Sequence, residues 1–145
     1  MKVYLAAAFS RKNEILQVAH QLEEIGVRVT SRWLTEQHDA PTDTSKSVFL
    51  AERAQIDLDD IDCADVLVRF SDDLSAPTVP SHLATGSRMG EMMHARANHK
   101  TIIVVGGHQC VFDYLPDVVH RRDVEELKSY LIASKTLYRS LFGWE

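Results

Sequence analysis

Apolar runs alternate along this chain with segments whose apolar residues recur at helical spacing. The continuous runs "KVYLAAAF" (2–9) and "KTIIVVGG" (100–107) are typical of central parallel strands that are buried on both faces. Shorter apolar segments at 27–30, 64–70 and 117–120 predict three further strands, the last of them short. The apolar pattern therefore predicts a sheet of about five strands.

Amphipathic segments between and after these strands predict helices. In the first of them, Ser10 is a predicted N-cap, Ile15 and Leu22 share one face, and Gly26 ends the helix. An Ala- and Met-rich stretch behind Gly86 predicts another helix. The predicted helices cover residues 10–25, 47–62, 87–98 and 122–141.

Strands that alternate with helices predict a single α/β domain over residues 1–145, a flavodoxin-like or Rossmann-like sandwich. Its parallel sheet of about five strands would carry helices on both faces. The polar segments 34–45 and 71–84 are predicted loops. Ligands of such sheets bind at the carboxyl ends of the strands. The loops at that edge begin near Ala8, Arg32, Phe70 and Gly106, and the third of them leads to Glu91.

Composition narrows the function classes. The formal net charge is −5 and the basic residues form no dense stripe, which argues against nucleic-acid binding. No apolar run is long enough to span a membrane, and Arg11 and Lys12 close the first run, which favours a buried strand over a signal peptide. Cys63 and Cys110 are the only cysteines, so we expect neither a disulfide framework nor a cysteine-rich metal site. A reducing cytoplasm fits this usage.

Several kinds of chemistry lack their motifs. There is no phosphate-binding G-x-x-x-x-G-K-[ST] loop, and no G-x-G-x-x-G follows the first strand. Asp72 and Asp73 end the third strand, as in phospho-acceptor receiver domains, but residues 6–9 supply no acid at the end of the first strand. The seven histidines are scattered. We expect no metal and no organic cofactor.

Four residues remain as candidates for chemistry, and each also has a structural interpretation. Tyr4 fits a core residue with its hydroxyl at a rim, and Trp33 a partly buried loop anchor. Asp57 belongs to a run of aspartates that reads as a solvated acidic face. Glu91 fits a first-turn acid that complements a helix dipole. Taken singly, Tyr4, Trp33 and the aspartates next to Asp57 are better explained structurally.

Taken together, these pieces are more specific. "VYLAAAF", "DLDDIDCADVLV", "TGSRMGE" and "VFDYLPDV" resemble motifs of the nucleoside 2-deoxyribosyltransferase family, including its nucleoside 5′-monophosphate N-glycosidase branch. The resemblance spans residues 2–131. It places the family's tyrosine at Tyr4, its functional acid at Asp57 and its nucleophile at Glu91. Ser87 departs from the pattern because it replaces the second glycine of the turn.

The resemblance implies a reaction at a glycosidic carbon. Glu91 would attack this carbon and hold the sugar as a glycosyl ester, while Asp57 would protonate or orient the leaving base. Retaining glycosidases use two carboxyl groups about 5 Å apart for this purpose. Tyr4 would donate a hydrogen bond to Glu91, and the helix N-terminus would keep Glu91 ionised.

The substrate-binding residues implied by the resemblance surround the glycine turn. The amides of Gly86 and Ser87, with Thr85 and Arg88, would hold a sugar hydroxyl or a phosphate. Arg88 also fits a solvent-facing residue or the ion-pair partner of an acid. Trp33 would stack on the base.

Several alternatives stay open. The glycosyl group would pass to water in a hydrolase or to a second base in a transferase, and the substrate would be a nucleoside or its 5′-monophosphate. Rival classes are a non-catalytic nucleotide-binding module and a structural flavodoxin-like domain. The resemblance also implies a homo-oligomer in which the segment 108–115 reaches a neighbouring site through Asp113 or His108. Apolar side chains near the C-terminus support that expectation: Leu137, Leu141, Phe142 and Trp144.

Overall fold

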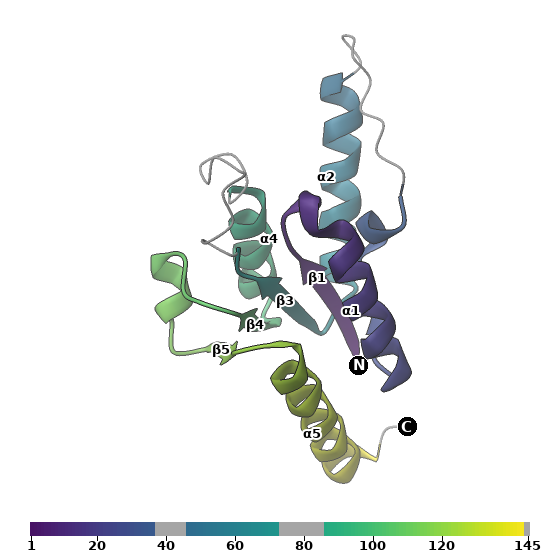
Figure 1. The fold of residues 1–145 in the computed structure, drawn as a ribbon, viewed down its shortest axis with the longest axis vertical. Helices are drawn as coiled ribbons and strands as arrows, with labels where there is room; N and C mark the ends of the chain where they lie inside the picture. The colour runs from purple at the N-terminus through teal and green to yellow at the C-terminus, as the bar shows by residue number, and fades with distance from the viewer. Residues whose placement is uncertain (37–45, 73–85, 144–145) are drawn as a thin grey trace.

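Five parallel strands form the centre of the molecule in the order β2-β1-β3-β4-β5 (Figure 1). The computed structural model describes residues 1–36, 46–72 and 86–143. This strand order is that of the flavodoxin-like fold, so the predicted fold class is confirmed. The strands are β1 (Lys2–Ala6), β2 (Arg28–Val29), β3 (Val66–Phe70), β4 (Thr101–Val105) and β5 (Val118–Arg121).

Helices cover both faces of the sheet. α2 packs against α4 on one face, and α1 and α5 lie on the other (Figure 1). Lys135 joins the latter two helices, because its Nζ donates to the carbonyls of Ile25 and Gly26 at the end of α1. The helices are α1 (Lys12–Glu24), α2 (Lys46–Asp62), α4 (Gly86–Ala97) and α5 (Val124–Phe142), with short 3₁₀ helices η1 (Phe9–Arg11), η2 (Arg32–Leu34) and η3 (Val111–Tyr114).

The core lies between the central strands and the helices. β1 and β4 are buried except for their first residues, and β3 is buried throughout, as expected for strands covered on both faces. Each fully buried Leu or Ile side chain contributes about 1.5–3 kcal/mol of transfer free energy. The helices contribute Ile15 and Leu22 from α1, Ile61 from α2, Met92 and Ala95 from α4, and Leu127 and Leu131 from α5.

The predicted start of the first helix is wrong, and the predicted start of the third helix is nearly right. Ser10 lies in η1 and is not the N-cap of α1; that position belongs to Arg11, whose side chain makes no capping bond. Gly86 is already the first residue of α4, one residue before the predicted start of this helix. Gly26 does end α1, with a φ of +75°. The predicted loops fall largely outside the described residues, at 37–45 and 73–85.

Candidate active site

The structure brings Tyr4 and Glu91 together. Tyr4 lies in the middle of β1 and is 1 % exposed. Its hydroxyl donates a hydrogen bond to Oε1 of Glu91 over 3.3 Å. Because this bond joins the central sheet to α4, it orients the Glu91 carboxyl group relative to the strand edge.

Glu91 is an acid held in an unfavourable environment. Burial and the charge of Asp57 raise its pKa to about 7, although the Tyr4 hydrogen bond and the charge of Arg88 act in the opposite direction. Burial and the charges of Glu91 and Asp57 also raise the pKa of Tyr4, so its hydroxyl stays protonated and remains a donor. The site therefore holds an acid that titrates near neutral pH.

The position of Glu91 corrects one expectation. Glu91 lies in the second turn of α4, and the first turn of this helix contains no acidic residue. The helix dipole acts mainly on the first turn. The prediction that the helix N-terminus keeps Glu91 ionised is therefore wrong, and its raised pKa shows the opposite balance.

Asp57 supplies the second carboxyl group, from α2 on the same face of the sheet. Burial and the charges of Asp60 and Glu36 raise its pKa to about 6, while Arg53 and Arg32 oppose the shift. Asp57 and Glu91 therefore form a pair of like charges that does not ionise fully at acidic pH.

Asp60 stabilises the loop beside this pair, a role that the sequence analysis did not assign. It is 5 % exposed and accepts hydrogen bonds from the backbone N–H of Arg32 over 2.9 Å and from Nε of Arg32 over 2.7 Å. The only sequence signal was its helical spacing from Asp57, which placed both residues on one face of α2. Asp60 thus holds the residues after β2 while its charge acts on Asp57.

Trp33 anchors its loop in the core and does not present an exposed ring on which a base could stack. It is 8 % exposed, and its indole N–H donates to the carbonyl of Leu5 over 2.8 Å. Stacking of Trp33 on a base is therefore disfavoured by its burial. Its aromatic neighbour Phe9 is 56 % exposed, with its ring centroid 6.4 Å from that of Trp33. The sequence does not indicate that Phe9 is exposed, because this residue ends an apolar run that predicts a buried strand.

The residues of the predicted glycine turn divide into two kinds. Gly86 and Ser87 are exposed at the start of α4, where their binding role stays a prediction, and Thr85 lies outside the described residues. Arg88 is 2 % exposed, and its two terminal nitrogens donate to the two carboxylate oxygens of Asp72, each over 2.7 Å. Arg88 is therefore the ion-pair partner of an acid, Asp72, which is one of the roles that its sequence position allows.

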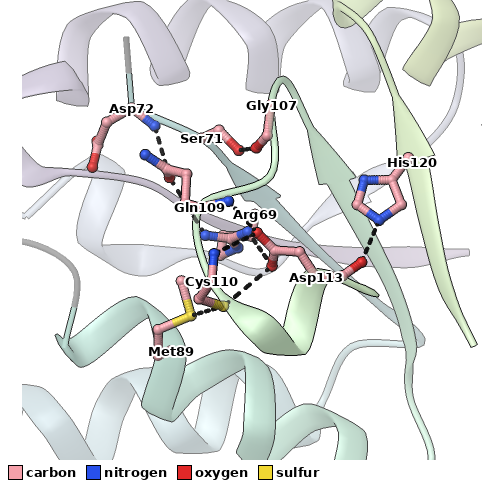
Figure 2. A network of polar contacts seen from close by, with 9 residues as sticks. All are labelled: Arg69, Ser71, Asp72, Met89, Gly107, Gln109, Cys110, Asp113 and His120. Carbon is pink, nitrogen blue, oxygen red and sulfur yellow. Dashed lines mark hydrogen bonds and ion pairs between the residues drawn. The ribbon is translucent and has the colours of Figure 1, made fainter. Parts of the chain in front are cut away.

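Asp113 does not contact solvent, which contradicts its predicted role in binding substrate across a subunit boundary. It is 0 % exposed and lies 2.5 Å from Nη2 of Arg69, which is also 0 % exposed (Figure 2). Burial alone would raise the pKa of Asp113, but the N–H of Gln109 and the guanidinium of Arg69 together lower it. His108 is exposed and stacks on the rings of Tyr114 and His120.

The described part of the chain contains neither a metal-binding cluster nor a membrane-spanning helix. Residues 1–36, 46–72 and 86–143 contain no group of three or more His, Cys, Asp or Glu side chains placed to hold a metal ion. None of the helices described in these ranges has the length and apolar character needed to cross a membrane.

Known proteins were compared with the chain at the levels of sequence and structure. No protein-family model and no curated protein matches the sequence. The solved CMP N-glycosidase BcmB of Clostridium botulinum is 20 % identical, with a TM-score of 0.55 over 90 % of this chain and 98 % of its own. A 2-deoxyribosyltransferase from Bacillus psychrosaccharolyticus is 19 % identical, with a TM-score of 0.61 over 92 % of this chain and 95 % of its own. The chain therefore has the fold of these two proteins, which is the fold that its resemblance to the nucleoside 2-deoxyribosyltransferase family implied.

Proposed function

We propose that this protein is a nucleoside 2-deoxyribosyltransferase-like enzyme that cleaves the N-glycosidic bond of a (deoxy)nucleoside and transfers the sugar to another base or to water. The observation that carries the proposal is the Tyr4–Glu91 hydrogen bond beside the like charge of Asp57. Strongly shifted acids in one site are typical of catalytic groups. The motifs around Tyr4, Asp57 and Glu91 and the shared fold support the same reaction class.

In the first step, an oxygen of ionised Glu91 attacks the anomeric carbon of the sugar. The bond from this carbon to the base nitrogen breaks, its electron pair moves to the base, and Asp57 supplies the proton that the base needs. In the second step, water or a nitrogen of a second base attacks the same carbon. The ester bond breaks, the Glu91 carboxylate is restored, and Asp57 receives the released proton.

The two carboxyl groups suit this division of labour because they share a proton near neutral pH. The pKa of Glu91 is about 7 and that of Asp57 about 6, and groups that interact in this way titrate as a pair. The reactive form has Glu91 ionised and Asp57 protonated. It is one of two singly protonated forms of the pair, and because Glu91 has the higher pKa, the proton resides mainly on Glu91 and the reactive form is the less populated of the two. We expect the singly protonated pair as a whole to be most populated between pH about 6 and 7.

The substrate is a nucleoside in our leading proposal, with a 2′-deoxynucleoside 5′-monophosphate as the alternative. The likeness in fold to a CMP N-glycosidase favours the monophosphate. The bidentate pairing of Arg88 with Asp72 favours the nucleoside, because this guanidinium is already neutralised. The amides of Gly86 and Ser87 serve either substrate, as a hydroxyl or a phosphate contact. A non-catalytic nucleotide-binding module is the alternative from another class.

We also propose a cytoplasmic homo-oligomer. The last turns of α5 leave large apolar side chains exposed, which is uncommon on a monomer surface. The η3 segment adds Val111 and Tyr114, 77 % and 73 % exposed. The exposed large apolar side chains in the last turns of α5 are Leu137, Tyr138, Leu141 and Phe142.

A panel of substrates tests the proposal. The purified protein is incubated with nucleosides and with 5′-monophosphates, each with and without a free acceptor base, and base release or exchange is followed by chromatography. Exchange that needs an acceptor identifies a transferase, and release without an acceptor identifies a hydrolase. Binding without turnover of any member of the panel would support the non-catalytic module instead.

A further inference from the structure

Arg88 lies close to Glu91 on the same helix but is bound to an acid from another element. Residues three apart on a helix share a face, so Arg88 and Glu91 are neighbours on α4. Asp72, directly after Ser71 at the end of β3, holds the guanidinium through two hydrogen bonds of 2.7 Å. This planar, two-point contact fixes both the position of the cation and the share of its charge that Asp72 neutralises.

The loop between β4 and β5 fixes Asp72 in turn (Figure 2). Oε1 of Gln109 accepts a hydrogen bond from the backbone N–H of Asp72 over 3.0 Å. The same oxygen lies 3.5 Å from Nη1 of Arg69, the arginine buried in β3. Gln109 therefore connects the backbone at Asp72 to the fully buried Arg69–Asp113 pair.

The same loop also contacts α4 directly (Figure 2). Sγ of Cys110 lies 3.3 Å from Sδ of Met89, the residue that follows Arg88. Asp113 holds the loop closed by accepting the N–H of Gln109 over 2.7 Å and that of Cys110 over 3.3 Å. One network, built around the fully buried Arg69–Asp113 pair, thus joins the β4–β5 loop, the end of β3 and the first turn of α4.

We propose that Arg88 and Asp72 are positioning residues that set the charge at Glu91, with Arg88 favouring the ionised nucleophile and Asp72 limiting that effect. The inference deepens the proposed function and rests on Glu91 being its nucleophile. Arg88 acts through Glu91 rather than through contact with the substrate. Asp72 acts only through Arg88.

The groups around Glu91 make the sign of each effect clear. They are Tyr4 from β1, Asp57 from α2 and Arg88 from α4 itself. His94, one turn further along α4, pairs with Asp62 over 2.8 Å. Among the described residues that act on Glu91, Arg88 is the only cation, so its removal raises the pKa of Glu91. Removal of the Asp72 charge leaves Arg88 unneutralised and lowers the pKa of Glu91.

The test compares Arg88→Met, Arg88→Lys and Asp72→Asn with the wild type. The titration of Glu91 is followed by NMR of carboxyl-labelled glutamate, assigned with Glu91→Gln, and the pH profile of kcat/KM is measured on the best substrate. We expect the Glu91 midpoint to rise by about half a pH unit or more in Arg88→Met and to fall in Asp72→Asn. Arg88→Lys should stay near the wild type, and the acid limb of kcat/KM should move with the midpoint.

A matched pair on the same helix serves as the control. Arg96 of α4 pairs with Asp117 over 2.9 Å near the surface, and Arg96→Met and Asp117→Asn should leave the Glu91 midpoint unchanged. Equal Glu91 midpoints in Arg88→Met, Asp72→Asn and the wild type would overturn the proposal and leave the network a structural role. A selective rise in KM for monophosphates in Arg88→Met, with the midpoint unchanged, would overturn it in favour of phosphate binding. Because the NMR titration needs no turnover, it gives its answer even if the proposed reaction fails. If Arg88→Met does not fold, the Asp72→Asn shift still decides.

Discussion

Two groups of acids inside this molecule have the same chemistry and opposite electrostatics. Asp113 is completely buried, yet its pKa is lowered, because backbone N–H groups and the Arg69 guanidinium outweigh the cost of burial. Glu91 is less buried, yet its pKa is raised to about 7, because burial and the charge of Asp57 outweigh the Tyr4 hydrogen bond. The difference lies in what surrounds each carboxylate, not in how deeply it lies.

This contrast separates an acid that stabilises the fold from an acid that is available for chemistry. A carboxylate that accepts hydrogen bonds and pairs with a cation is stabilised in its ionised form. It therefore stays ionised far below neutral pH. A carboxylate whose ionised form is destabilised by burial or by a like charge can accept or lose a proton near neutral pH, at some cost in the stability of the fold. The pairs Arg69–Asp113 and Arg88–Asp72 belong to the first kind, and Asp57 and Glu91 to the second.

The largest effect is expected from Glu91→Gln. This change keeps the size of the side chain and removes the proposed nucleophile, so kcat should fall by about 10³-fold or more. Turnover is measured by base release at saturating substrate, with the exposed Glu125→Gln as the control. A variant that keeps a tenth of the wild-type rate would exclude Glu91 as the nucleophile.

The same variant should gain stability, with a definite pH dependence. The folded pKa of Glu91 is raised from 4.5 to about 7, so folding disfavours its ionised form and wild-type stability falls as pH rises through this window. Glutamine does not ionise, so the gain should be about 3 kcal/mol well above pH 7 and vanish below pH about 4.5. Denaturant unfolding at pH 4 and pH 8 measures it, and equal stability at pH 8 would contradict the raised pKa.

The next effect, on stability, is expected from a change at Asp113. Asp113→Asn leaves the buried Arg69 cation without its counter-charge, which should cost about 3 kcal/mol of unfolding free energy at pH 7. The lowered pKa of Asp113 means that this cost shrinks as pH falls through that pKa, the opposite of the Glu91→Gln pattern. The surface variant Asp117→Asn should change stability little. A kcat loss without a stability loss would show that Asp113 is catalytic after all.

The sequence could predict the second kind of acid but not the first. The motifs around Tyr4, Asp57 and Glu91 drew on local patterns, and the alternation of strands and helices predicted the sheet that brings them together. Arg69 stood inside an apolar strand with no visible partner, because Asp113 lies 44 residues further along the chain. Only the strand order brings that pair together, so Asp113 was interpreted as a binding residue.

The same limit explains why the sequence misplaces Glu91 within its helix. Two glycines close together are typical of a turn, so local propensity places a glycine turn just before Glu91 and Glu91 in the first turn of the helix. In the structure Arg88, Met92 and Ala95 are buried along one face of α4, and their tertiary contacts outweigh the poor helix propensity of Gly86 and Gly90. As a result Glu91 lies a full turn deeper in the helix than the sequence suggested.

A smaller effect on rate should distinguish the two carboxyl groups of the site. Asp57→Asn cannot supply a proton, so we expect about a hundredfold loss of rate for substrates with a poor leaving base. Substrates whose bases leave without protonation should lose much less. The rate is measured over a series of bases, with the exposed Asp59→Asn as the control. An equal loss for every base would assign Asp57 to sugar positioning.

The smallest effect is expected from Tyr4→Phe, which removes only the hydroxyl that donates to Glu91. The Tyr4 hydrogen bond lowers the pKa of Glu91, so without it the pKa of Glu91 should rise above about 7. Because the nucleophile must be ionised, the acid limb of kcat/KM should move to higher pH, and the rate should fall more at pH 6 than at pH 8.5. The bond is 3.3 Å long, and a net worth of about 0.5–1.5 kcal/mol corresponds to a two- to tenfold loss on the acid side. Tyr130→Phe, on α5, should leave the profile unchanged. A uniform loss at all pH values would mean that Tyr4 fixes the geometry of Glu91 without affecting its ionisation.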